Sequence, residues 1–172
     1  MNPNCPHGWL RPQTEMICLD DLEVMFSGEP VTVRFGERHA AIHHLDRRLF
    51  FTVHVQAPGI DARLEGVDNY VTGRGLARFL DNLDFRGWEG ERRWVNADRD
   101  LIVSATFRSG GHIELAWTIR PWRHSVYGEW EATVTTSMEA GAEKDDLAAQ
   151  MHAFLTAEGF PVEYHESDNE FS

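Results

Sequence analysis

Three histidines stand close together between residues 37 and 46, at His39, His43 and His44. If this segment were helical, His39 and His43 would share one face at a spacing of i and i+4, and neutral imidazole is a common zinc ligand. The segment has no His-Glu-x-x-His arrangement to supply a general base, and it falls between two expected strands, where solvated loop histidines are common. The sequence therefore assigns no metal site and no cofactor, and it leaves open whether these histidines bind a metal.

Two pairs of neighbouring carboxylates, Asp98 with Asp100 and Glu89 with Glu91, have the residue types needed for acid and base catalysis. Such a pair works only if burial drives the two pKa values apart. Both pairs lie beside arginines, which favours solvated charge pairing instead. The chain also lacks the Gly-x-Ser-x-Gly nucleophile elbow and the glycine-rich pattern of a phosphate-binding loop. These observations weigh against an enzyme, and they predict no catalytic residue.

The segment from Phe85 to Trp94 is rich in tryptophan and arginine, and residues 120–123 repeat that composition further along the chain. Both residue types are frequent at binding hot spots, because each combines a large contact area with directional polar groups. A second interpretation is that Trp88 and Trp94 pack at the end of the sheet, with arginine stems covering their rings. We favour packing for these two tryptophans and keep the region as a candidate binding surface, made of Trp88, Arg92, Trp94, Trp122 and Arg123.

Two further histidines, His54 and His112, occupy outward positions on expected strands, beside Glu65 and Glu114. Outward side chains on neighbouring strands can converge across a sheet. We therefore add His54 and His112 to the candidate binding residues. They are the basis of an alternative function, a small-ligand-binding protein or hydrolase with a pocket between sheet and helices.

The elements that position these residues follow from the apolar pattern. Alternation with a period of two predicts strands over residues 31–35, 49–55, 60–64, 101–107, 113–119 and 130–138. Ala57-Pro58-Gly59 and Ser109-Gly110-Gly111 are turn sequences, so each joins its two neighbours as a hairpin. Residues 16–26 fit neither period well, and we prefer a short strand there.

Two stretches have the helical spacing i, i+3, i+4 and i+7 instead. The first runs from Leu76 to Leu83, with Thr72 as its expected N-cap. The second runs from residue 145 to Leu155, begins with two aspartates that favour the positive end of the helix dipole, and is ended by Gly159.

A parallel connection needs about a dozen residues or more, so strands joined by such short turns form a mainly antiparallel sheet. Clean alternation indicates one packed face, which two amphipathic helices can cover. We therefore predict an α+β fold, with a mainly antiparallel sheet of about six strands and two helices packed on one face. The single domain is expected over residues 31–158, after an irregular acidic extension at 1–30 and before an acidic flexible tail at 159–172.

The net charge of −12 is unevenly distributed along the 172 residues. Residues 1–30 hold five acidic residues and one arginine, residues 31–138 hold fourteen residues of each sign, and residues 139–172 hold nine acidic residues and one lysine. A nucleic-acid-binding protein needs basic charge concentrated on one face, so nucleic acid is not an expected partner.

The termini and the cysteines indicate a compartment. The first residues resemble no secretory signal, and no apolar stretch approaches the roughly 20 residues of a membrane helix. Cys5 and Cys18 form neither a disulfide framework nor a zinc pattern. We expect a bacterial protein of the reducing cytoplasm, with free thiols and no membrane contact.

Several short runs resemble a known family. They are Gly75-Leu-Ala-Arg-Phe-Leu80, Arg86-Gly-Trp-Glu-Gly-Glu-Arg92 with Trp94, Gly111-His-Ile-Glu-Leu115, Arg120-Pro-Trp122 and Met138-Glu-Ala-Gly141. Over about residues 31–155 the chain resembles a family of small bacterial proteins, mostly actinobacterial, of unknown function. The Gly-Trp-x-Gly-Glu-Arg segment is the most specific part of this resemblance. It implies a cytoplasmic α+β domain without an assigned activity, so it supplies no catalytic residues.

These observations favour a non-catalytic protein-interaction domain, of which an immunity-like protein is one form. The expected partner is another protein, held by the open sheet face and the Trp/Arg region. The sequence does not determine the oligomeric state.

Overall fold

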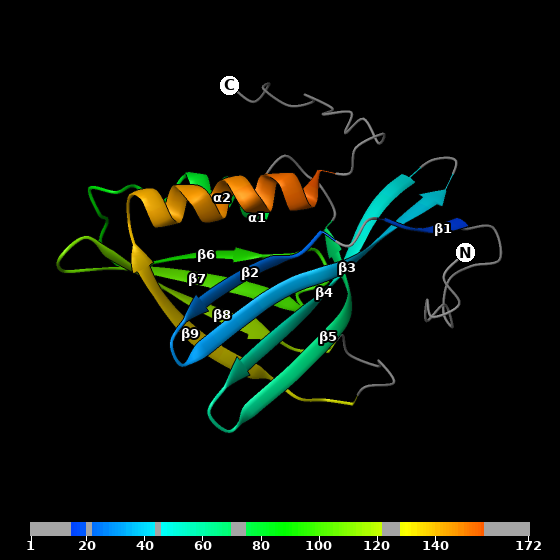
Figure 1. The fold of residues 1–172 in the computed structure, drawn as a ribbon, viewed down its shortest axis with the longest axis horizontal. Coiled ribbons are helices and arrows are strands. Elements are labelled where there is room, and N and C mark those ends of the chain that lie inside the picture. Colours follow the sequence, from blue (N-terminus) through cyan, green and yellow to red (C-terminus); the bar gives the residue numbers. More distant parts are fainter. Residues whose placement is uncertain (1–14, 20–21, 44–45, 70–74, 122–127, 157–172) are drawn as a thin grey trace, which may run out of the picture.

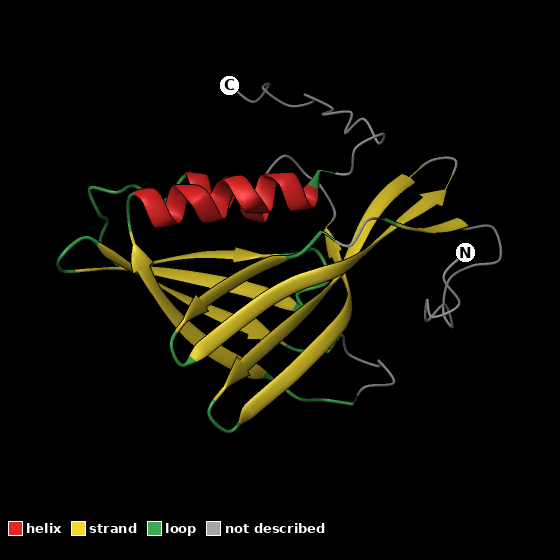
Figure 2. Ribbon diagram, in the orientation of Figure 1, coloured by secondary structure: helices red, strands yellow, loops and turns green. Residues whose placement is uncertain are grey.

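The computed structural model describes residues 15–19, 22–43, 46–69, 75–121 and 128–156 (Figure 1). These residues form nine strands and two helices, and the strands dominate (Figure 2). In chain order the elements are β1 (Glu15–Cys18), β2 (Val24–Gly28), β3 (Val31–His43), β4 (Asp46–Ala57), β5 (Ile60–Asn69), α1 (Leu76–Asp81), β6 (Glu91–Val95), β7 (Leu101–Arg108), β8 (His112–Ile119), β9 (Ala132–Glu139) and α2 (Ala142–Leu155).

The strands form two antiparallel sheets. In the first sheet the order is β1-β3-β4-β5. β1 pairs with the C-terminal part of β3, and β2 pairs with its N-terminal part. Each end of the long strand β3 therefore has one of these two short strands beside it. In the second sheet the order is β6-β7-β8-β9. The α+β class and the antiparallel pairing are confirmed, but the expectation of one sheet of about six strands is wrong. Alternation identified which side of a strand is buried, but it does not identify what buries it.

The core lies between the two sheets. The ring of Phe35 on β3 and the ring of Trp117 on β8 lie 5.6 Å apart, which places the inner faces of the two sheets against each other. Phe154 of α2 joins this cluster, 6.2 Å from Phe35 and 5.6 Å from Phe51 on β4. All four side chains are almost completely buried. The helices therefore do not cover one face of a single sheet; they close one side of a two-sheet core (Figure 1).

The two helices pack against each other on that side. Leu76, Leu80 and Leu83, three members of the expected stripe, are buried, although α1 itself ends at Asp81. Its expected N-cap, Thr72, lies outside the described residues, and Gly75 precedes the first helical residue. No helix in the described ranges is long and apolar enough to cross a membrane.

The region 1–30 is more regular than expected in its second half. β1 pairs with the far end of β3, and β2 forms a hairpin with the start of β3 through residues 29–30. The preference for a short strand within residues 16–26 is therefore confirmed, whereas an irregular extension up to residue 30 is wrong. Residues 1–14 and the tail 159–172, with Cys5 and Gly159, lie outside the described residues.

Candidate functional site

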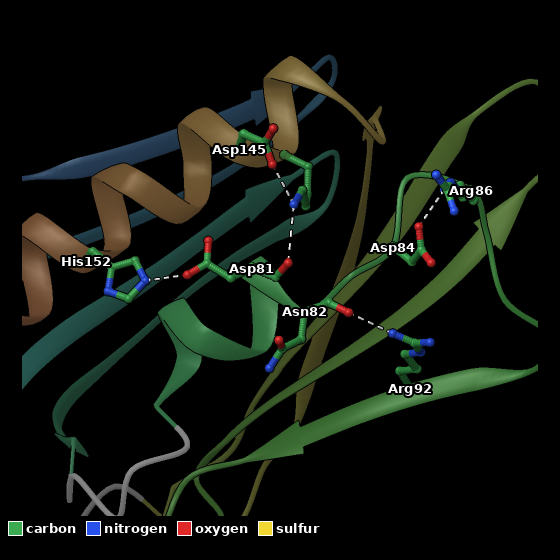
Figure 3. A network of polar contacts seen from close by, with 8 residues as sticks. Asp81, Asn82, Asp84, Arg86, Arg92, Asp145 and His152 are labelled. Atoms are coloured by element: carbon green, nitrogen blue, oxygen red, sulfur yellow. Dashed lines mark hydrogen bonds and ion pairs between the residues drawn. The ribbon is translucent and has the colours of Figure 1, made fainter. Parts of the chain in front are cut away.

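The chain between α1 and β6, residues 82–90, is a tight, well-anchored connection that we call the α1–β6 segment. The carboxylate of Asp84 accepts a hydrogen bond from the backbone N–H of Arg86 at 2.9 Å, and the carbonyl of Asp84 accepts one from Gly87 at 3.0 Å (Figure 3). Gly87 has a φ of +95°, which favours glycine. A Cβ atom at Gly87 would lie only 2.6 Å from the ring of Phe107 on β7. The backbone here passes directly over an aromatic side chain of the second sheet.

Trp88 and Arg92 fix the other half of this segment. The indole of Trp88 packs against Phe107 with ring centroids 5.6 Å apart, and the guanidinium of Arg92 lies 4.7 Å from the centre of the Trp88 ring. Arg92 also donates a hydrogen bond to the carbonyl of Asn82 at 2.7 Å (Figure 3). Trp88 and Trp94 are both partly buried against the core, so the packing interpretation of these tryptophans is confirmed.

Phe85 is the exposed part of the segment. Its side chain is 63% exposed, and the guanidinium of Arg86 lies 5.4 Å from the centre of its ring. Neither residue was among the candidate binding residues, because an isolated Phe in a turn has no periodic pattern that would indicate whether it is packed or exposed.

A polar network attaches α1 to α2 beside this segment (Figure 3). The imidazole Nε2 of His152 lies 2.5 Å from the carboxylate of Asp81. Lys144, which is buried, lies 2.5 Å from Asp145 and donates to the carbonyl of Asp81 at 3.4 Å. Because Asp81 is the last residue of α1, these contacts hold the start of the α1–β6 segment in place.

The candidate histidines of the strands are not brought together. His54 lies on β4 in the first sheet, where its Nε2 is 2.7 Å from Asp61, whereas His112 is exposed at the start of β8 in the second sheet. The hydrogen bond from His54 is the main cause that lowers the pKa of the exposed Asp61 carboxyl, followed by the hydrogen bond from Gln56. The alternative function places a pocket between sheet and helices, and the buried aromatic cluster described above lies in that space.

Polar side chains on the outer face of the first sheet pair with one another. The guanidinium of Arg63 lies 2.6 Å from Glu37 and 3.1 Å from Glu65, and Thr52 donates to Glu37 at 2.9 Å. The guanidinium of Arg34 likewise forms an ion pair with the carboxylate of Glu23, at 3.9 Å. This face is charged but largely compensated, so it offers little uncompensated charge to a partner.

Two carboxylates, those of Asp68 and Asp100, are buried where the two sheets meet at the far end of β5. Asp100 is 5% exposed, and burial is the main cause that raises its pKa to about 6; the nearby charges of Asp98 and Asp68 raise it further. A hydrogen bond from the Asn96 amide to its carboxylate acts in the opposite direction. Asn96 also donates to the carbonyl of Asp68 at 3.2 Å and accepts from the N–H groups of Asp100 and Leu101 at 3.1 and 3.0 Å. Asp100 was considered as half of an acid and base pair with Asp98, but Asp98 is exposed.

The histidine cluster does not have the helical geometry that would bring it together. His39 and His43 both lie in β3, where their backbones pair with Phe50 and Asp46 of β4. Positions four apart on a strand are separated by about 13 Å, compared with about 6 Å on a helix. No group of three or more His, Cys, Asp or Glu side chains suited to a metal ion occurs among the described residues, which do not include His44. Trp122 and Arg123 also lie outside the described part of the chain.

The model of a family of unknown function, DUF6228, matches residues 24–158, most of the chain. The chain belongs to this family. No curated protein and no solved structure gave a significant match. The DUF6228 match begins at the first residue of β2 and runs just past the end of α2, so it includes the α1–β6 segment, both sheets apart from β1, and the buried Asp100.

Proposed function

We propose that this DUF6228 domain is a non-catalytic protein-interaction module of the cytoplasm, which holds another protein through the α1–β6 segment as an immunity-like protein would. The single observation that carries the proposal is the position of Phe85, a largely exposed aromatic side chain on a connection whose backbone is fixed. Large aromatic side chains are frequent hot spots, because they bury a large apolar area when a partner covers them.

Rigidity of the segment supports this role. Gly87 packs over Phe107, Trp88 packs beside it, and Arg92 ties β6 to the end of α1. A binding surface that is already ordered loses little conformational entropy when the partner arrives. Phe85 is neither part of the core cluster nor packed against it, so its side chain is not needed for the packing of the core.

The ligand-binding or hydrolase alternative receives less support. It requires a pocket between sheet and helices, and that space holds Phe35, Trp117 and Phe154. His54 and His112, which would have served it, lie on different sheets.

The test compares Phe85→Ala with Met25→Ala, a matched control. Both residues are large, apolar and 63% exposed, but Met25 lies on β2, away from the α1–β6 segment. The wild-type chain and each variant are immobilised and exposed to an extract of the native host, and partners are quantified by mass spectrometry. We expect the wild type and Met25→Ala to retain the same stoichiometric partner and Phe85→Ala to bind it at least about 30-fold more weakly, the effect of a hot-spot residue.

Thermal unfolding of each variant shows that the fold is intact, because neither side chain is packed in the core. Equal retention by Phe85→Ala and the wild type would contradict the proposal. So would the absence of any stoichiometric partner for the wild-type chain.

A further inference from the structure

Two arginines, Arg86 in the α1–β6 segment and Arg92 directly after it on β6, differ from most other arginines of the protein in their surroundings. Among the described side chains, Arg34, Arg48, Arg63, Arg108 and Arg120 each lie within ion-pair distance of a carboxylate. Arg86 and Arg92 have no carboxylate within that distance in the described ranges. The carboxylate nearest to Arg86 in sequence, Asp84, accepts a hydrogen bond from the Arg86 backbone instead. In a chain with a net charge of −12, these are two positive charges without an ion-pair partner among the described residues.

Each of these guanidinium groups lies over an aromatic ring. Arg86 stacks on Phe85 and Arg92 stacks on Trp88, at 5.4 and 4.7 Å from the ring centres. Both arginines are exposed, and a guanidinium group presents its N–H groups as a planar fork that matches a carboxylate. One N–H of Arg92 is occupied by the carbonyl of Asn82, and Figure 3 shows both arginines at the same connection between α1 and β6.

The arrangement combines an exposed ring with two cations that have no ion-pair partner in the described part of the chain. An apolar partner side chain would cover Phe85, and carboxylates beside it would bind the two guanidinium groups. We propose that the partner held by the α1–β6 segment is a different protein that presents an acidic surface around an apolar side chain. This inference rests on the proposed function, because it names the chemistry of the partner at the same site.

Nucleic acid fits these observations less well. A duplex carries one negative charge per about 1.7 Å of its axis, so its binding requires many basic side chains along one face. Two arginines in an acidic protein do not supply them. A second copy of this chain is also acidic, and self-association is therefore an outcome that the experiment has to distinguish.

The first experiment uses defined probes and the full chain. Amide resonances of the ¹⁵N-labelled protein are followed by NMR while the capped peptide Glu-Glu-Leu-Leu-Glu-Glu, its counterpart Lys-Lys-Leu-Leu-Lys-Lys, or a single-stranded thymidine oligonucleotide is added. We expect the acidic peptide to shift resonances of residues 84–92 in a saturable way, and the other two probes to leave them in place. Equal shifts with the basic peptide or the oligonucleotide, or no shift with the acidic peptide, would overturn the acidic partner.

The variants test the arginines individually. Arg86→Gln should weaken binding of the acidic peptide about tenfold, because charge-assisted hydrogen bonds to a carboxylate are lost. The matched control is Arg99→Gln, since Arg99 is also exposed and without a described carboxylate partner but is not stacked on a ring. Arg92→Lys keeps the charge and loses the planar fork, so it should also weaken binding. Equal affinities of Arg86→Gln and Arg99→Gln for the acidic peptide would refute the inference. Resonance shifts at residues 84–92 that depend on protein concentration without peptide would also refute it, because they would identify a second copy of the chain as the occupant.

Failure of this inference can be separated from failure of the proposed function. Suppose that Phe85→Ala loses the partner captured from extract, whereas Arg86→Gln retains it. If the wild type also retains it at about 0.5 M salt, where the Debye length is only a few ångströms, charge contributes little to the binding. The proposed interaction module then stands, and the proposal of an acidic partner is wrong. If capture does not depend on Phe85, both proposals fail.

Discussion

Replacing the buried Asp100 with asparagine should stabilise the protein at neutral pH and have much less effect in acid. The carboxylate of Asp100 lies where the end of β5 meets the connection between β6 and β7, and it accepts a hydrogen bond from Asn96. An asparagine side chain at position 100 has nearly the same shape and keeps an oxygen that can accept this bond. The main change is therefore the loss of a buried negative charge.

The magnitude follows from the shift in pKa. Burial raises the pKa of Asp100 from 3.8 to about 6, so the folded chain binds this proton more tightly than the unfolded chain does. The resulting stabilisation is fully present below pH 3.8 and is lost as the pH rises through about 6. A shift of about two units corresponds to roughly 3 kcal/mol. The free energy of unfolding of Asp100→Asn minus that of the wild type should rise by about this amount between about pH 3 and pH 7.5.

Urea unfolding at a series of pH values measures this difference, and the carboxyl ¹³C resonance of Asp100 reports its pKa directly. A new amide N–H₂ without a partner would lower the stability of the variant by a constant amount, which does not change the slope with pH. The control is Asp98→Asn in the same turn, whose exposed side chain should change stability by less than about 0.5 kcal/mol. A difference between Asp100→Asn and the wild type that stays constant with pH would refute the reasoning.

Two further predictions test the packing of the second sheet. Gly87→Ala should destabilise the protein by about 3 kcal/mol, because the new methyl group would lie 2.6 Å from Phe107 on a backbone with positive φ. Gly90 also has positive φ but faces open space, so Gly90→Ala should cost only about 1 kcal/mol. Equal losses of stability in urea unfolding would exclude the ring contact as the cause. Thr136→Val should cost roughly 1–3 kcal/mol, because it removes the hydroxyl that accepts the buried indole N–H of Trp117 at 2.9 Å, and an unchanged unfolding midpoint would show that this hydrogen bond contributes little.

The sequence indicated the segment that we propose as a binding surface, but not the arrangement of its parts. The concentration of Trp and Arg between residues 85 and 94 singled out this segment, and the packing of Trp88 and Trp94 followed from the preference of such rings for element junctions. The exposure of Phe85 and the stacking of Arg86 on it depend on the turn that begins at Asp84. The hydrogen bonds of that turn are local, but the close approach of its backbone to Phe107 at Gly87 is a tertiary contact that no local pattern contains.

The sequence by itself determined the hairpins and the long helix. Alternation over β4, β5, β7 and β8 and the turns at 58–59 and 109–111 are local properties, because the period of side-chain direction and the preference of glycine for positive φ act within a few residues. The stripe of α2 is local for the same reason.

Only the tertiary structure decided how these elements divide into two sheets. β6 has few apolar residues and becomes a strand by pairing with β7, and the far end of β3 remains extended across its histidines because β1 and β4 flank it. The burial of Asp100 likewise depends on β5 arriving from the other sheet. These features rest on contacts between residues far apart in the chain, so the physical forces that select them do not appear in any local window of the sequence.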